Sequence, residues 1–277
     1  MPSSRPSARA ARVLTPIHSS PGVADAADPR KPAHAVITGT AGAIGAAIAA
    51  RFQAAGYRTC GIDRAQSPPG SAVDMYIQAD LHAFVNDEQA RDDTLTRIRN
   101  WLAGQPLRTL INNAAYQYVS RVHPIAVAEL QRSYDVNVLA PYLLVSNLAA
   151  ELERGGGSVV NVGSIHARLT KPGFLAYATT KAALAALTRG LALDFEDRFR
   201  VNCVEPASVS TPMLQDGFRA APGKLQELRD HHPQRRIASP AEVAELVFQI
   251  NSNELRFLHG SCIDMSGGIG ARLHDPL

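Results

Sequence analysis

The sequence has little that would indicate a membrane protein, a metal site or a disulfide framework. Its longest apolar runs, such as the one around residues 138 to 148, contain polar residues and fall short of the roughly 20 apolar residues that a bilayer-spanning helix needs. Its three cysteines, Cys60, Cys203 and Cys262, are odd in number and form no CxxC pair. This argues against both disulfides and a zinc site. We therefore expect buried free thiols, no bound metal and a cytoplasmic protein.

Strong charge of one sign is also missing. The chain has 277 residues and a formal net charge of only +3, and no cluster of Lys and Arg has aromatic residues interleaved with it. A nucleic-acid partner is therefore not expected, and a small molecule is the favoured partner. With 45% hydrophobic residues, a chain of this length can form one large core.

Residues 1–31 differ in composition from the rest of the chain. Ser, Pro, Arg and Ala dominate there, and the first acidic residue is Asp25. The segment lacks the long apolar region of a secretory signal, and its acid-poor composition is compatible with a transit peptide. Because no clear amphipathic helix is visible, we favour a disordered tail. No linker or second composition block divides the remainder, so residues 32–277 are predicted to form one domain.

Short β-branched runs alternate with longer helical stretches from residue 33 onward, which is typical of βα units. The expected strands are 34–39, 57–63, 75–80, 109–114, 158–163, 200–205 and 261–265. The expected helices are 43–56, 83–103, 126–154, 175–197 and 240–251. The strand runs are almost continuously apolar, as in strands covered by helices on both faces. We predict an α/β fold, a single Rossmann-type doubly wound domain with about seven parallel strands.

A glycine-rich turn, TGTAGAIG at residues 38–45, lies between the first expected strand and helix. Such a turn lets backbone amides and the positive end of a helix approach a pyrophosphate, although a tight βα turn without a ligand has the same composition. Asp63 ends the second strand about twenty residues later, where a carboxylate can bind the ribose hydroxyls and would repel a 2′-phosphate. We therefore expect NAD, with NADP as the alternative, because Arg64 could stack on adenine or soften that repulsion.

The stretch YATTK, residues 177–181, places Tyr177 and Lys181 one helical turn apart. A phenol with a pKa of about 10 is a poor acid or base at neutral pH, and a close cation can lower that pKa by one to three units. Ser164 follows the strand 158–163, at the strand end that opens onto a ligand crevice. Asn137 interrupts an apolar helix, where a buried polar side chain needs a structural or catalytic reason.

These motifs, in this order, resemble those of the short-chain dehydrogenase/reductase family over residues 33–277. The residues that carry the resemblance are TGTAGAIG at 38–45, Asp63, AspLeu at 80–81, NNAA at 112–115, Asn137, Ser164, YATTK and VEPASVSTPM at 204–213. Three positions depart from the family's usual glycines: Ala43, Ala115 and Ala207. They put cofactor affinity and pocket width in doubt more than the reaction class.

The resemblance implies four catalytic residues. Tyr177 would be the general acid/base, Lys181 would lower its pKa and hold the nicotinamide ribose, Ser164 would polarise the substrate oxygen, and Asn137 would hold a water behind Lys181. It also implies a set of cofactor-binding residues: Thr38, Gly39, Ala43, Ile44, Gly45, Asp63, Asp80, Leu81, Asn113, Ala114, Tyr177, Lys181, Pro206, Val209 and Thr211.

Substrate contacts are expected from Ser164, Tyr177 and His166. His166 could bind a second substrate hydroxyl or be a structural histidine, and Tyr116 is expected in the pocket wall. Residues 214–235 mix charges with Gly and Pro, have no aromatic cluster, and are expected to form a mobile lid over a small polar substrate. Within them, His231 and His232 are expected to be solvated.

The sequence therefore predicts an oxidoreductase that interconverts a secondary alcohol and a ketone with NAD on a sugar, polyol or hydroxy acid. One alternative is an NADPH-dependent keto reductase of acyl or other intermediates. Another is a non-catalytic dinucleotide-binding regulator, because fold does not determine function. The resemblance also implies a homotetramer or homodimer formed through the helices that carry Asn137 and Tyr177.

Overall fold

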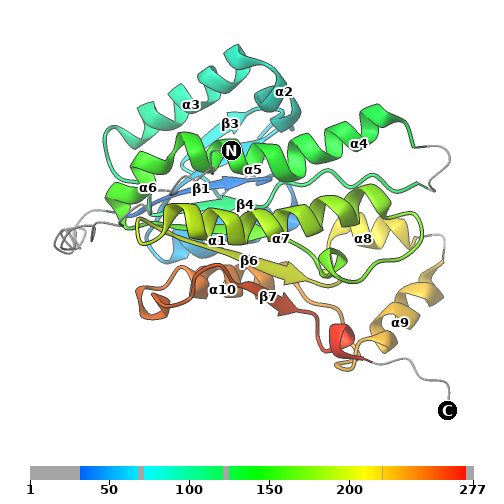
Figure 1. Cartoon of the computed structure of the whole chain (residues 1–277). Helices are drawn as coiled ribbons and strands as arrows, with labels where there is room; N and C mark the ends of the chain where they lie inside the picture. The colour runs from blue at the N-terminus through cyan, green and yellow to red at the C-terminus, as the bar shows by residue number, and fades with distance from the viewer. Residues whose placement is uncertain (1–31, 68–71, 121–124, 220, 273–277) are drawn as a thin grey trace, which may run out of the picture.

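A seven-stranded parallel sheet forms the centre of the protein (Figure 1). The computed structural model describes residues 32–67, 72–120, 125–219 and 221–272, so the expected tail at 1–31 lies outside the described residues. The strands are β1 (His34–Thr38), β2 (Arg58–Asp63), β3 (Met75–Gln78), β4 (Thr109–Asn112), β5 (Ser158–Val162), β6 (Arg200–Pro206) and β7 (Cys262–Met265). Their order is β3-β2-β1-β4-β5-β6-β7, and every pair is parallel. The prediction of a doubly wound α/β sheet is confirmed.

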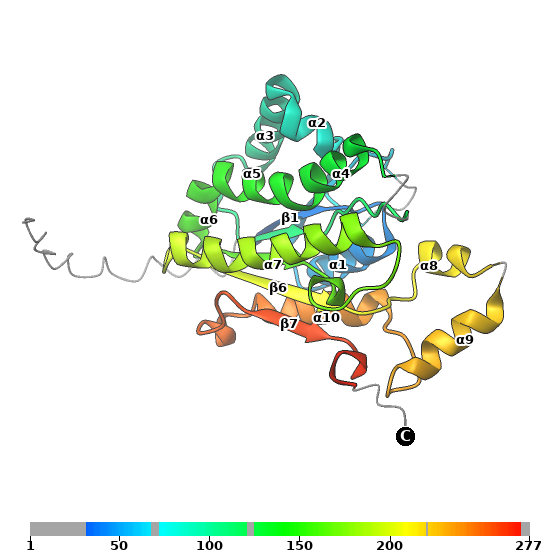
Figure 2. The same ribbon diagram turned by 45° about the vertical axis from the view of Figure 1, so that its right-hand side comes forward.

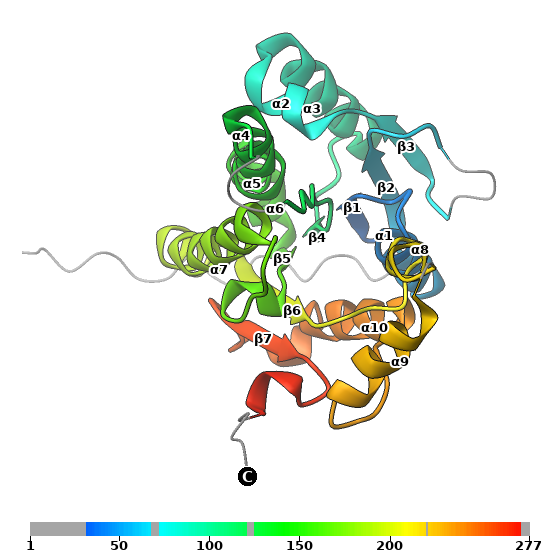
Figure 3. The same cartoon turned by 90° about the vertical axis from the view of Figure 1, so that its right-hand side faces the viewer.

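Helices cover both faces of this sheet (Figure 3). The α-helices are α1 (Ala43–Ala54), α2 (Leu81–Asn86), α3 (Glu88–Leu102), α4 (Val127–Tyr134), α5 (Ala140–Asn147), α6 (Ala149–Gly155), α7 (Leu175–Phe195), α8 (Pro212–Gly217), α9 (Pro222–His231) and α10 (Pro240–Ile250). A π-helical segment, η1 (Asp135–Leu139), joins α4 to α5, and the 3-10 turns are η2 (Ile165–Ala167), η3 (Asn253–Leu255) and η4 (Ile269–Ala271).

The core has two halves, one on each face of the sheet. Alternate strand residues point to opposite faces, so Val36 belongs to the core half formed with α2, α3, α5, α6 and α7, while Ile37 belongs to the half formed with α1 and α10. Strand β1 pairs with β2 on one side and with β4 on the other. The order of the strands in the sheet therefore reverses between β1 and β4. In an open α/β sheet, a ligand crevice forms at the carboxyl ends of the strands at such a reversal.

Two of the predicted helices are divided. The helix expected over 83–103 is α2 and α3, because Asp87 takes an extended backbone and its carboxylate accepts hydrogen bonds from the first backbone amides of α3. The helix expected over 126–154 consists of α4, η1, α5 and α6. The Asp87 cap and the π-helical segment η1 divide these helices, although the spacing of apolar residues in the sequence continues through both breaks.

The expected lid at 214–235 is largely helical. Apart from residue 220, it comprises most of α8 and all of α9, which lie at the edge toward which β6 and β7 point (Figure 2). His232 is only 2% exposed, and its Nδ1 hydrogen-bonds the carbonyl oxygen of Leu228. The expectation that His232 is solvated is therefore wrong, because α9 packs this side chain beneath the turn at Gly267.

The cysteines largely follow expectation. Cys60 and Cys203 are buried, whereas Cys262 is only partly buried, and all three are free thiols. None of the helices in the described part of the chain combines the length and apolar character that crossing a membrane requires.

Candidate active site

A cleft of about 430 Å³ opens at the carboxyl ends of β1, β2 and β4, where the strand order reverses. Its walls come from the first glycine turn, the ends of β2 and β4, the start of α2, the helix α4 and η1, the start of α7, and α8. The lining residues are Gly39, Ala41, Gly42, Ala43, Ile44, Gly45, Ile62, Asp63, Arg64, Ala79, Asp80, Leu81, Asn113, Ala114, Ala115, Tyr116, Gln117, Arg132, Val136, Tyr177, Thr211, Pro212 and Met213.

The glycine turn forms the floor of the cleft next to the amino end of α1. Gly39 has φ +75°, and a Cβ at Gly45 would overlap the Gly39 carbonyl group. The cap residue Gly42 offers no side chain, so the first amides of α1 have no side-chain partner and no intrahelical one. Ala43 is the first residue of α1 and does not have a positive φ, so its methyl group is accommodated. This surface fits the pyrophosphate of a dinucleotide.

Asp63 closes the turn from the side of β2. Its Oδ2 accepts a hydrogen bond from the Ala41 amide and its Oδ1 accepts one from the Ala65 amide, both at 3.0 Å. A carboxylate has about four acceptor positions, so two remain for hydroxyl donors in the cleft. Arg64, exposed beside it, also lines the cleft.

Thr38 and Asn113 hold the ends of β1 and β4 together. The Thr38 hydroxyl accepts hydrogen bonds from the amides of Asn113 and Ala114, both at 3.0 Å. The Asn113 side chain donates to the carbonyl oxygens of Thr38 and Gly39. Gly39, Asn113 and Ala114 line the cleft, whereas Thr38 does not line it and supports these residues through its hydrogen bonds.

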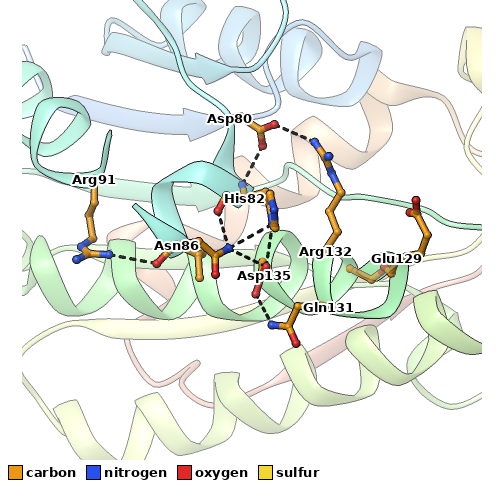
Figure 4. Close-up of polar contacts among 10 residues, drawn as sticks. Asp80, His82, Asn86, Arg91, Glu129, Gln131, Arg132 and Asp135 are labelled. Atoms are coloured by element: carbon orange, nitrogen blue, oxygen red, sulfur yellow. Dashed lines mark hydrogen bonds and ion pairs between the residues drawn. The ribbon is translucent and has the colours of Figure 1, made fainter. Parts of the chain in front are cut away.

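Asp80 and Arg132 form an ion pair across the mouth of the cleft (Figure 4). Asp80 caps α2 by accepting from the His82 amide, and its Oδ2 lies 2.8 Å from Arg132 Nη2. The Arg132 guanidinium also lies 5.3 Å from the ring centroid of Tyr116, whose hydroxyl donates to Glu129. Tyr116 lines the cleft as predicted, whereas Arg132 was not predicted.

A buried carboxylate sets the position of this pair. Asp135, fully buried in η1, accepts hydrogen bonds from Asn86 and Gln131 and lies 2.8 Å from His82 Nδ1 (Figure 4). Since His82 and Asn86 belong to α2, this network joins α2 to the helix that carries Arg132.

Tyr177 lines the cleft, and Ser164 and His166 lie next to Tyr177 but are not among the lining residues. The Ser164 hydroxyl acts on the Tyr177 phenol and lowers its pKa, and Ser164 Oγ accepts from the His166 amide at 3.2 Å. The His166 ring stacks on Phe174 with centroids 4.7 Å apart and meets the edge of Tyr177 at 5.7 Å. Burial lowers the pKa of His166, which favours the neutral imidazole.

Lys181 lies beneath Tyr177 and is 2% exposed. Its Nζ donates to the Val162 carbonyl oxygen at 2.7 Å and lies 5.5 Å from the Tyr177 ring centroid. Burial lowers the pKa of Lys181 to about 8 and raises that of Tyr177 to about 12, while the Ser164 hydrogen bond opposes the latter shift. Lys181 is not among the causes of the Tyr177 pKa shift here, because its ammonium points at a carbonyl group, so the expected lowering of that pKa by Lys181 stays a prediction.

Asn137 is buried in η1, and its side chain connects η1 to the backbone at Tyr116 and to α7. Its Oδ1 accepts from the Tyr116 amide, and its Nδ2 donates to the Tyr116 carbonyl oxygen and to the Thr180 hydroxyl. Both amide hydrogens are used, so only one acceptor position is left for a water molecule. These contacts place Asn137 beside α7, and the water that it would hold behind Lys181 stays a prediction.

Not every predicted cofactor residue reaches the cleft. Among the described residues, Thr38, Lys181, Pro206 and Val209 do not line it. Thr211 does, and its hydroxyl caps α8 by accepting from the Leu214 amide.

Comparison with known proteins identifies the family. The family model described as enoyl-(acyl carrier protein) reductase matches residues 39–270. Protein FixR of Bradyrhizobium diazoefficiens is 33% identical over 254 residues, which cover 87% of this chain and 88% of FixR. The chain belongs to the short-chain dehydrogenase/reductase family. It is therefore an oxidoreductase of that family, as the motifs predicted.

Solved structures of the family resemble this fold closely. The ligand-free aldohexose dehydrogenase AldT of Thermoplasma acidophilum matches with a TM-score of 0.80 and 27% identity, over 89% of this chain and 98% of that one. The L-sorbose reductase of Gluconobacter frateurii, complexed with NADPH and L-sorbose, matches with a TM-score of 0.79 and 26% identity, over 87% and 98%.

Gly45→Ala tests the glycine turn of this short-chain dehydrogenase/reductase. The new methyl group would collide with the Gly39 carbonyl, so we expect lower stability and at least about tenfold weaker dinucleotide binding, since either the turn or α1 must shift. Gly190→Ala is the control, because a Cβ there meets no atom within 4 Å. Thermal unfolding and fluorescence titration with NADH measure the two effects; unchanged binding in Gly45→Ala would contradict this account.

Lys181→Met tests the cost of burying the ammonium. A lysine pKa lowered from 10.5 to about 8 destabilises the fold below pH 8, and this penalty fades as pH rises to 10.5. We expect the variant to be more stable at neutral pH by on the order of 1–3 kcal/mol, after the lost Val162 hydrogen bond is counted. Urea unfolding should show this advantage shrinking toward pH 10.5, with the exposed Lys171→Met as control. A less stable variant at neutral pH would refute the argument.

Proposed function

We propose that this protein is an NAD-preferring dehydrogenase that interconverts a secondary alcohol and a ketone on a small polar substrate. The observation that carries the proposal is the Tyr177 phenol that lines the cleft, with the Ser164 hydroxyl acting on it and Lys181 buried beneath it. NAD bound along the glycine turn would accept or supply the hydride. In this proposal Asn137, Ser164, Tyr177 and Lys181 are the catalytic set.

The proton chemistry belongs to Tyr177. Its phenol is protonated at neutral pH, since burial raises its pKa to about 12, so it is ready to donate to a ketone oxygen. In the reverse direction the phenol must first lose its proton so that the phenolate can accept the alcohol proton, and the Ser164 hydroxyl favours that phenolate by donating to it. Lys181 would hold the ribose only if its Nζ turned from the Val162 carbonyl toward the cleft.

A sugar, polyol or hydroxy acid suits this end of the cleft. His166 is held beside Tyr177 by stacking on Phe174, and its lowered pKa leaves a neutral ring that can exchange a hydrogen bond with a second hydroxyl. Two structural relatives are named for sugars, an aldohexose dehydrogenase and an L-sorbose reductase. Both observations support a hydroxylated substrate.

NADPH-dependent keto reduction is the second candidate. Arg64 and Arg132 line the cleft near Asp63 and Asp80, and the L-sorbose reductase carries NADPH. Arg132 is already paired with Asp80, which leaves Arg64 as the cation for a 2′-phosphate. Because Asp63 lies beside it and would repel that phosphate, we favour NAD.

The proposed enzyme acts in the cytoplasm as a homodimer or homotetramer. Leu139, Tyr142 and Leu193 are 39%, 45% and 78% exposed on the helical segments from η1 to α5 and on α7. Large apolar side chains on these segments would be covered by a second copy of the chain.

A spectrophotometric screen for NADH formation tests the reaction class. Residues 32–277 are assayed with sugars, polyols, hydroxy acids and secondary alcohols, with NAD and with NADP. Tyr177→Phe should lower kcat by at least about 100-fold, because the proton carrier is removed. Tyr57→Phe is the control, since its ring packs on Phe52 and Phe248 outside the cleft. NAD binding without turnover of any compound would favour the non-catalytic alternative.

Asp63→Asn tests the cofactor preference. Removing the negative charge should raise the ratio of kcat/KM with NADP to that with NAD at least about tenfold, because one repulsion of the 2′-phosphate is lost. Asp74→Asn removes the same charge from a side chain that binds the Thr59 amide and is not among the residues lining the cleft. A wild-type preference for NADP would support the reductase alternative.

A further inference from the structure

A second cluster of reactive groups lies beneath α7, between β6 and β7. Cys203 and Cys262 are register partners on these strands, and Glu205 and Asp264 are the next partners on the same face. The face is the one covered by α7, because Cys262 Sγ lies 3.8 Å from the Ala185 carbonyl oxygen and 3.7 Å from Arg189 Nη1.

Three of these groups converge on one point. The sulfur atoms of Cys203 and Cys262 and a carboxylate oxygen of Glu205 all lie within 4.8 Å of one another. Cys203 is fully buried and Glu205 is 2% exposed. Glu205 Oε2 accepts from Arg168 Nε at 3.0 Å, which leaves its other oxygen for a further partner. Two thiolates and a carboxylate are ligands that zinc uses, and such donor atoms surround an ion at about 2.0–2.3 Å.

The arrangement is rigid and accessible. Both cysteines are fixed by a parallel ladder in the interior of the fold, so the sulfur atoms are held near each other without a loop. Cys262 is only partly buried, and the Arg168 side chain that flanks the cluster is 51% exposed. An ion could therefore enter from the β7 side without unfolding the sheet.

The surrounding charges accept a divalent ion. The Arg189 guanidinium lies beside Cys262, with its Nη1 3.7 Å from the sulfur atom. Its positive charge stabilises a thiolate at Cys262. An ion that displaces both thiol protons adds two positive charges and removes two, so the net charge beside the Lys181 ammonium stays the same.

We propose that Cys203, Cys262 and Glu205 form a binding site for a divalent metal ion of the zinc class, with the fourth position open to water. Binding converts the two thiols to thiolates and releases both protons to solvent. The ligands come from residues far apart in the sequence, which is why the absence of a CxxC pair pointed away from a metal. A disulfide would use only the two sulfur atoms and would not engage the Glu205 carboxylate, which lies within 4.8 Å of both.

Cobalt titration tests the site. Untagged full-length chain is reduced, freed of metal with a chelator and titrated anaerobically with Co²⁺. We expect one ion per chain, thiolate-to-cobalt charge-transfer absorption with the visible bands of a tetrahedral ion, and release of about two protons per ion. Cys203→Ser and Cys262→Ser should each weaken binding at least about 100-fold, and Glu205→Gln about tenfold.

Cys60→Ser is the matched control, since Cys60 is an equally buried thiol on β2 outside the cluster, and it should bind Co²⁺ like the wild type. If a variant fails to fold, the wild-type protein provides a second test. Bound Zn²⁺ should protect Cys262 of the wild type from alkylation. Cobalt absorption that survives in Cys203→Ser and Cys262→Ser, or a Cys203–Cys262 disulfide that forms in air despite excess Zn²⁺, would overturn the proposal.

Discussion

The burial of the Lys181 ammonium is the constraint on which the centre of this protein depends. A charge that is 2% exposed must be stabilised locally, and here the Val162 carbonyl oxygen accepts from Nζ at 2.7 Å. That contact requires α7 to cross the end of β5 closely. The same crossing brings Tyr177 to Ser164, so the geometry that solvates the lysine also assembles the reactive pair.

The π-helical segment η1 supplies the second half of this assembly. By adding a residue to the helical turn it lets Asp135 and Asn137 both point inward, toward α2 and α7 respectively. Asp135 holds the helix against α2, while Asn137 fastens the Tyr116 backbone to Thr180. The hydrogen bonds of Asp135 and Asn137 therefore both stabilise the fold and determine the shape of the cleft.

Much of this could be predicted from the sequence because the determinants are local. Parallel strands buried on both faces are almost continuously apolar, and reactive residues follow their carboxyl ends, so the strands and Ser164 were found. The orientation of individual side chains and the partners that they contact could not be predicted from the sequence. Lys181 turns to a carbonyl group, Arg132 pairs with Asp80, and the Cys203 partner lies on another strand, all of which depend on tertiary contacts.

Helix α7 connects the two polar clusters of the molecule. Tyr177, Lys181, Ala185 and Arg189 follow one another at intervals of four residues, so each lies about one turn beyond the last. Tyr177 lines the cleft and Lys181 lies beneath Tyr177, whereas Ala185 and Arg189 contact Cys262 through a carbonyl oxygen and a guanidinium. Because Cys203 also lies close enough to influence the Lys181 pKa, any change in the charge of the thiol pair acts directly on the buried ammonium. In the proposed site, the exchange of two protons for one divalent ion avoids such a change, so a metal there is compatible with the adjacent Lys181 ammonium.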